Sequence, residues 1–170
     1  MRTGTARVYI YSADQIAGYV ITQDKFAAII TQGKIRAYRA TSDQAIGAGA
    51  WTKVQLNAKS FDPSSQYDPT TNYRFTVAPY YDGYFLIHSK ITVVTFAAAG
   101  YVEIAIYKNG VIAARGGIYI PAGVTGGHVA VTDYLVLADG DYIEIYVNFT
   151  QTGDVSFGEY VTYLDINRLF

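Results

Sequence analysis

The sequence contains no cysteine, only four prolines and few charged residues. The absence of cysteine excludes a disulfide scaffold, thiolate zinc sites and cysteine nucleophiles. Charged side chains make up 16% of the chain, and the 13 basic and 14 acidic residues are scattered, for a net charge of −1. Because there is no basic run, the sequence has no electrostatic footprint for nucleic acid or an anionic membrane surface. We expect neither as a partner.

Long apolar runs are also missing. No run approaches the roughly 20 residues that a membrane-spanning helix needs. The first residues, Met1 to Gly4, lead into polar residues and short alternating segments, not into the apolar core of a secretory signal peptide. We therefore expect no secretory signal and no membrane span.

Aromatic and small residues dominate what is present: 17 Tyr, 8 Phe and 16 Gly, with 51% hydrophobic residues overall. This composition favours pleated, half-buried strands over amphipathic helices. From Lys34 onward, strand signals recur with turn residues between them, which predicts an all-β antiparallel sandwich and no helix. The expected strands are 34–40, 51–57, 73–77, 83–95, 101–108, 111–120, 128–137, 141–150 and 160–169.

The segment before Lys34 has a different character. Residues 1–33 read as a β-rich N-terminal arm that attaches the head domain, residues 34–170, to other molecules. Arg7 to Tyr11 alternates as a strand does, whereas Ser12 and Gln15 also fit the capping box of a short helix. Strand and helix both remain open for this arm.

The strand expected at 83–95 has two unusual faces. Phe85 and Ile87 begin a face that continues with apolar residues, as a core-facing strand requires. The opposite face begins with Tyr84 and Leu86, where a half-buried strand facing water would carry charges. We expect this second face to be covered as well, by another copy of the chain.

Two further patterns fix the expected register. Residues Asn109 and Gly110 form the favoured pair for a two-residue type I′ hairpin turn, and Asp139 to Asp141 form a tight connection. The strand after that connection alternates most clearly. Its inward residues are expected to be Ile143, Ile145, Val147 and Phe149, and its outward residues Tyr142, Glu144, Tyr146 and Asn148.

No catalytic constellation is visible. The only histidines are His88, placed mid-strand, and His128, placed at a strand entry, and the sequence has no G-x-S-x-G nucleophile elbow. Carboxylates cluster in loops at Asp62, Asp68 and Asp139, where calcium binding is possible, although Asp-Pro and Asp-Gly are ordinary turn chemistry. We expect no enzyme activity, no cofactor and no resident metal.

The tyrosines point to contacts, because tyrosine joins an apolar ring to a polar tip and is enriched at interfaces. Tyr67, Tyr80 and Tyr81 lie in or beside predicted loops. We expect these three to be exposed and to contribute to a partner or ligand surface.

Several short motifs occur in a familiar order. Phe75 and Gly83 to Phe85 form an aromatic-turn-glycine-aromatic signature, Asn109-Gly110 forms a central hairpin, and Gly140-Asp141 forms the penultimate turn before a last strand ending in INRLF. Over residues 34–170 the sequence resembles the complement 1q-type globular head, whose jelly roll is shared with the tumour-necrosis-factor superfamily. The resemblance implies an antiparallel jelly-roll sandwich of about ten strands. Relatives of this head occur on phage and bacterial surface proteins.

The resemblance implies a homotrimer in which one sheet packs around a three-fold axis. That sheet would contain the strand from Gly83, those near Lys34 and Trp51, the strand from His128 and the C-terminal strand. Its axis-facing side chains would include Tyr84, Leu86, His88, Tyr134 and Tyr163.

Departures from the animal members shape the expected function. The sequence has no collagen-like Gly-X-Y run, no cysteine and no secretory leader. A virion protein assembled in a host cytoplasm needs none of these, so we expect a non-enzymatic trimer on a virion surface.

The first interpretation of this trimer is a phage capsid decoration protein that clamps neighbouring capsid proteins through residues 1–33. The alternative is a receptor-binding head of a tail or fibre that recognises a host surface glycan. A glycan hydrolase is a third class, and it would need a facing carboxylate pair that the sequence does not reveal.

Overall fold

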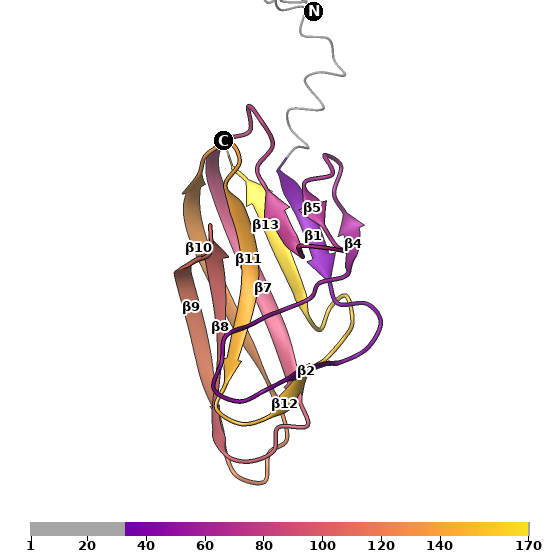
Figure 1. Cartoon of the computed structure of the whole chain (residues 1–170), viewed down its shortest axis with the longest axis vertical. Coiled ribbons are helices and arrows are strands. Elements are labelled where there is room, and N and C mark those ends of the chain that lie inside the picture. Colours follow the sequence, from indigo (N-terminus) through magenta and orange to yellow (C-terminus); the bar gives the residue numbers. More distant parts are fainter. Residues whose placement is uncertain (1–32, 170) are drawn as a thin grey trace, which may run out of the picture. The chain divides into compact units, whose positions relative to one another are not determined.

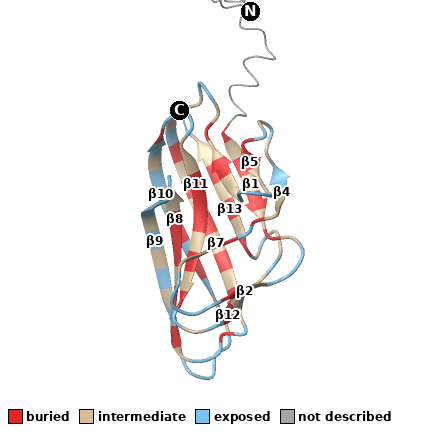
Figure 2. Cartoon of the chain, viewed as in Figure 1, coloured by how far each residue is buried: buried red, intermediate tan, exposed pale blue. Residues whose placement is uncertain are grey.

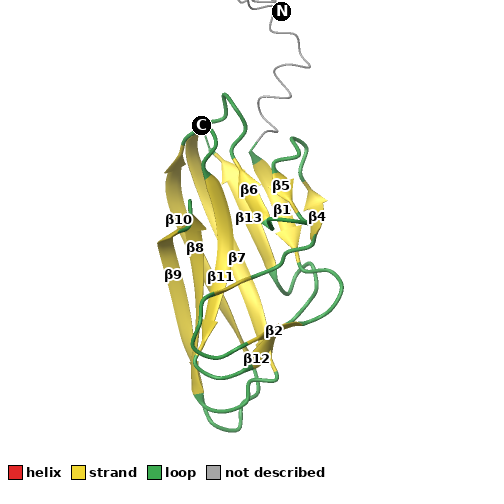
Figure 3. Cartoon of the chain, viewed as in Figure 1, coloured by secondary structure: helices red, strands yellow, loops and turns green. Residues whose placement is uncertain are grey.

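A computed structural model describes residues 33–169, and this part of the chain folds into two antiparallel β-sheets (Figure 1). The described residues contain strands, turns and loops but no helix (Figure 3), so none of their elements is a helix that could span a membrane. The strands are β1 Lys34–Tyr38, β2 Gln44–Ile46, β3 Thr52–Lys53, β4 Ala58–Phe61, β5 Tyr67–Asp68, β6 Arg74–Thr76, β7 Gly83–Val94, β8 Gly100–Lys108, β9 Val111–Ile120, β10 Gly127–Leu137, β11 Tyr142–Phe149, β12 Gly153–Val155 and β13 Tyr163–Arg168.

The two sheets have distinct membership. In the first sheet the order is β2-β12-β7-β13-β1-β4, and β10 pairs with the other edge of β7. In the second sheet the order is β5-β6-β11-β8-β9, and β3 pairs with β11. The sheets lie face to face as a sandwich, which confirms both the all-β sandwich predicted from turn spacing and the jelly roll implied by the resemblance. Strands beyond the expected ten, such as β5 and β12, are only two or three residues long.

The core lies between the sheets (Figure 2). Along β7 every second residue from Phe85 to Val93 is buried, and along β11 the buried residues include Ile143, Ile145 and Val147. This period of two places one face of each strand in the core. The facing predicted for the inward residues of both strands is therefore confirmed.

The hairpin between β8 and β9 has the predicted turn. Asn109 and Gly110 are its two central residues, and both have positive φ, 52° and 79°. A type I′ turn requires positive φ at both central residues, which asparagine and glycine tolerate best. The Asn109 side chain also ties this turn to the neighbouring one, donating to Asp141 Oδ1 at 2.7 Å and accepting from Tyr142 N at 2.9 Å.

The loop carboxylates stabilise turns. Asp62 accepts from the backbone N–H groups of Gln66 and Tyr67, and Asp139 accepts from three successive N–H groups, those of residues 80–82. Asp68 accepts from the N–H groups of residues 70–72, which hold the pKa of its carboxyl well below its usual range. These bonds account for the acidic loops as turn chemistry, and the described residues contain no group of three or more acidic or histidine side chains placed to bind a metal.

Asp141 couples a turn to stability at acidic pH. The Ala138 N–H and the side chains of Lys108 and Asn109 lower the pKa of Asp141 from its ordinary 3.8 to about 2. A carboxyl whose pKa is lowered on folding stabilises the protein above its unfolded pKa, and that contribution is lost as pH falls through the folded pKa. The Asp141 contribution is therefore complete above about pH 4 and is lost between about pH 4 and 2.

We predict that Asp141→Asn lowers the free energy of unfolding at pH 7 by about 2 kcal/mol and that the difference shrinks toward pH 2. Urea denaturation at both pH values measures this. Asp82→Asn is the control, because it removes the same charge nearby from a carboxylate that has no hydrogen bond to the described residues. Equal losses in the two variants would contradict a specific role for the Asp141 hydrogen bonds.

The structure corrects the expectations around Trp51. A single strand was predicted over 51–57, but β3 ends at Lys53 and the chain then crosses to the other sheet, where β4 begins at Ala58. The strand beside Trp51 was expected in the sheet that faces the three-fold axis, and this is wrong. It pairs with β11 in the second sheet, because Trp51 packs edge-on against Tyr107 and Val54 N donates to Ile145 O at 2.8 Å.

The predicted arm falls almost entirely outside the described residues. Its last residue, Gly33, is described: its φ is 75° and its carbonyl accepts from Arg168 N at 2.9 Å. The choice between strand and short helix within residues 1–32, and the clamping role assigned to them, stay predictions.

Candidate functional site

The outer face of the first sheet brings the predicted interface residues together. Strand pairing sets them in rows: Leu86 lies opposite Tyr134, and His88 lies between Thr132 on β10 and Asp165 on β13. Five side chains were predicted to face a three-fold axis, and all five lie on this face: Tyr84, Leu86, His88, Tyr134 and Tyr163. The structure therefore places them on one surface, made by β1, β13, β7 and β10.

One end of this face is apolar. Tyr134 is 65% exposed and Val136 is 59% exposed, and Tyr84, about half exposed, lies directly opposite Val136 in the β7–β10 pairing. Leu86 is half-buried beside them. A single exposed apolar side chain is ordinary, but adjacent ones on a regular sheet form a patch of the kind found at interfaces. We call these four residues, Tyr84, Leu86, Tyr134 and Val136, the apolar patch.

The middle of the face is a fixed polar network. Arg36 on β1 makes a two-pronged ion pair with Asp165, at 2.7 and 2.6 Å, and this pair raises the pKa of the guanidinium further above its ordinary value. His88 contacts Thr132 Oγ1 through Nδ1 at 2.7 Å and the Tyr163 hydroxyl through Nε2 at 3.3 Å. These contacts link β1, β13, β7 and β10 across the face, and the charge-assisted pair is the strongest of them.

Tyr163 is the junction of this network. The guanidinium of Arg36 lies 4.8 Å from its ring centroid, and the ammonium of Lys90 lies 5.4 Å from it. Cations over an aromatic face are attracted by the negative potential of the ring. Sequence reasoning found Tyr163 but not Arg36, Asp165 or Val136. For Val136 a signal was present, because it stands two residues after Tyr134 and so on the same face.

The expected ligand tyrosines behave differently from one another. Tyr80 is exposed, as predicted, at the tip of the loop after β6. Tyr81 is only partly exposed, because it packs against the core with the Arg168 guanidinium 5.6 Å from its ring. The expectation that Tyr67 is exposed is wrong: it is 3% exposed, since its ring fills the core and its hydroxyl donates to Leu56 O at 3.1 Å.

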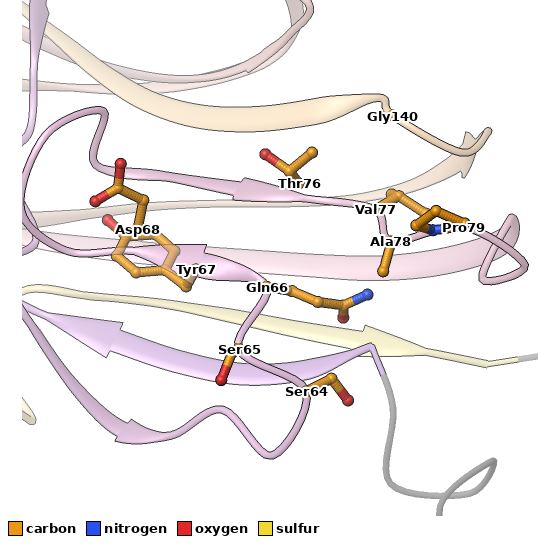
Figure 4. A pocket seen from close by; sticks show the side chains of 10 residues that line it. All are labelled: Ser64, Ser65, Gln66, Tyr67, Asp68, Thr76, Val77, Ala78, Pro79 and Gly140. Carbon is orange, nitrogen blue, oxygen red and sulfur yellow. The ribbon is translucent and has the colours of Figure 1, made fainter.

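A pocket of about 480 Å³ lies beside Tyr67 (Figure 4). Gln66 is 6% exposed there, and neither polar atom of its carboxamide has a hydrogen-bond partner among the residues the structure describes. In the figure its side chain extends toward Ala78 and Pro79. Gln66 lines the pocket, but both of its carboxamide atoms are inaccessible to solvent.

The histidines show no catalytic geometry. His128 Nδ1 lies 2.8 Å from Thr92 Oγ1, at the entry of β10. His88 contacts a threonine and a tyrosine hydroxyl, and its cross-strand neighbour Asp165 is engaged by Arg36. A serine-histidine-carboxylate arrangement needs the histidine between nucleophile and acid, and neither described histidine is so placed.

Comparisons with known proteins bear on the fold. No family model matches the sequence, and no curated protein matches it. Solved structures do match. Murine APRIL at pH 5.0 has a TM-score of 0.62 at 12% identity, covering 81% of this chain and all of that chain. Eiger TNF from S. frugiperda has a TM-score of 0.61 at 11% identity, covering 82% of this chain and 94% of that chain.

The globular domain of zebrafish complement 1qA has a TM-score of 0.53 at 11% identity, covering 82% of this chain and 98% of that chain. The fold is the TNF/complement 1q jelly roll. At these identities the likeness shows the fold alone. In this TNF/complement 1q-like head, the β1-β13-β7-β10 face carries the apolar patch and the polar network, and the β5-β6-β11-β8-β9 sheet forms the opposite layer.

Proposed function

We propose that this chain is a non-enzymatic binding head that forms a homotrimer through the outer face of the first sheet. The observation that carries the proposal is the apolar patch, where Tyr134, Val136 and Tyr84 stand exposed side by side in register. Burying this surface against other copies removes apolar area from water. Each subunit would contact its two neighbours through two different parts of the same sheet, so that three copies close a ring.

The polar network supports the same surface as an interface. Burying an unpaired charge is costly, but Arg36 and Asp165 already neutralise each other in a two-pronged pair. His88 likewise has both ring nitrogens engaged. Lys90 has no ion pair among the described residues, but its ammonium lies over the Tyr163 ring. The face therefore offers neighbouring subunits largely paired polar groups beside an apolar patch, the usual composition of a protein interface.

Sedimentation tests the trimer directly. At micromolar concentration the 18.7 kDa chain should sediment as one species of three times its mass. Only monomers at that concentration, together with no cross-linked trimer at tenfold higher concentration, would contradict the proposal.

The setting we propose is a virion surface, on the strength of the sequence resemblance, with capsid decoration as the first role and receptor binding as the second. The two roles differ in what a particle loses without the protein. Particles lacking a decoration protein should lose heat resistance and still adsorb to cells. Particles lacking a receptor-binding head should fail to adsorb and keep capsids of unchanged stability.

A further inference from the structure

A second surface lies on the outer face of the second sheet, where two tyrosines border a shallow pocket of about 490 Å³. Tyr101 on β8 and Tyr119 on β9 lie directly opposite each other, 60% and 55% exposed. Their ring centroids are 5.0 Å apart and the rings are inclined by 59°. Glu103, Gly117, Ile118 and Thr150 complete the lining. The two rings therefore lie next to each other on this face, beside the Glu103 carboxylate.

Two glycines shape this pocket. Gly117 lies opposite Glu103 and carries no side chain, so no side chain fills the surface between Tyr119 and Arg115. A Cβ at Gly117 would stand 3.3 Å from Val102 O. Gly100 lets Thr150 approach, since a Cβ at Gly100 would stand 2.3 Å from Thr150 Oγ1. That hydroxyl accepts from Tyr101 N at 2.8 Å and fixes the start of β8, which carries the first tyrosine.

The polar groups beside the rings are balanced in charge. Glu103 and Arg115 form a loose ion pair at 3.6 Å on side chains that are 35% and 66% exposed, so both remain accessible to a ligand. A site with one acid and one base gives no net attraction to an anionic ligand such as a phosphate.

From this geometry we infer that the Tyr101–Tyr119 pocket binds a neutral pyranoside. The C–H face of a sugar ring carries partial positive charge and packs on the negative face of an aromatic ring. The hydroxyls around that ring donate to a carboxylate and accept from a guanidinium, and charge-assisted bonds of this kind are the strong ones. The inference assigns a site to the receptor-binding role and rests on that second candidate role. It does not rest on trimerisation, because one protomer supplies every lining residue.

The position of the pocket suits the binding of an external ligand. It lies where β8 begins and β9 ends, at the end of the described sandwich opposite Gly33 and Leu169 (Figure 1). It is on the second sheet, so a trimer assembled through the first sheet leaves it open. Three such pockets in one trimer would bind a multivalent glycan much more tightly than a single sugar, by about 100-fold or more.

The full chain should be titrated with the methyl pyranosides of glucose, galactose, mannose and N-acetylglucosamine, followed by amide NMR shifts. We expect at least one to bind with millimolar affinity and to shift Tyr101, Glu103 and Tyr119. Tyr119→Ala should weaken that binding about tenfold, and Glu103→Gln, which keeps the shape, several-fold. The control Tyr80→Ala removes a tyrosine that is 88% exposed, against 55% for Tyr119, at the other end of the sandwich, and it should leave binding at this pocket unchanged.

Absence of binding by all four sugars up to about 20 mM would overturn the inference. So would binding that both pocket variants retain, or capture of a protein on this face without any sugar affinity. The outcome is separable from the trimer, because a monomeric variant should still bind a single sugar with unchanged affinity and lose only the gain on a multivalent glycan.

Discussion

Tyr134→Glu should convert the proposed trimer into folded monomers. In the proposed assembly this substitution puts three negative charges into an apolar interface, where an unpaired ion costs several kcal/mol. In the isolated subunit the side chain is 65% exposed, so a glutamate there remains in water and the sandwich survives. Sedimentation should give a single species of one-third the wild-type mass, with an unchanged far-ultraviolet circular dichroism spectrum.

Tyr101→Glu is the matched control for this experiment. Tyr101 also projects from a strand, is 60% exposed, and loses the same ring for the same charge. It lies on the second sheet, outside the proposed interface, so this variant should remain trimeric. If both variants dissociate, the effect is a general one of added charge; if neither does, the trimer is not built on the first sheet.

The first sheet shows how much of the site the sequence could predict. Alternation along β7 and β10 places Tyr84, Leu86 and Tyr134 on one face, because a period of two follows from strand geometry alone. The Arg36–Asp165 pair was not predictable in this way, since it joins residues 129 positions apart. Only the β1–β13 register brings the two side chains together.

Short strands and covered polar residues escaped prediction for a related reason. The strand β12 has three residues, and its pairing with β2 and β7 is set by tertiary contacts, not by its own pattern. Glu144 points away from the core as predicted, yet it is buried, because β3 lies beside it and Lys53 Nζ approaches its carboxylate at 2.5 Å. Periodicity indicates which way a side chain points, but not what lies over it.

Tyrosines in loops were the least predictable. Tyr67 and Tyr80 both stand near turn residues, yet one fills the core and the other is exposed. The difference comes from Asp62, whose carboxylate accepts from Tyr67 N and turns the chain so that β5 pairs with β6. The tyrosines of the sugar pocket fall on ordinary strands, and only the β8–β9 register places Tyr101 opposite Tyr119.

Ile145→Ala should lower the free energy of unfolding by about 2–5 kcal/mol, since it loses buried apolar area and leaves a cavity that a closely packed core fills only in part. Ile145 is 1% exposed at the centre of β11, opposite Ile106 on β8. Val111→Ala is the control: it also trims a β-branched strand residue, but an exposed one, and should cost less than about 0.5 kcal/mol. Urea denaturation must be run at one protein concentration, because subunit association adds to apparent stability.

The same substitution can be tested in the monomeric Tyr134→Glu background. There Ile145→Ala should lower the free energy of unfolding by the same amount, because the core lies within one subunit. A loss of stability seen only in the trimer would mean that the sandwich depends on assembly for its packing.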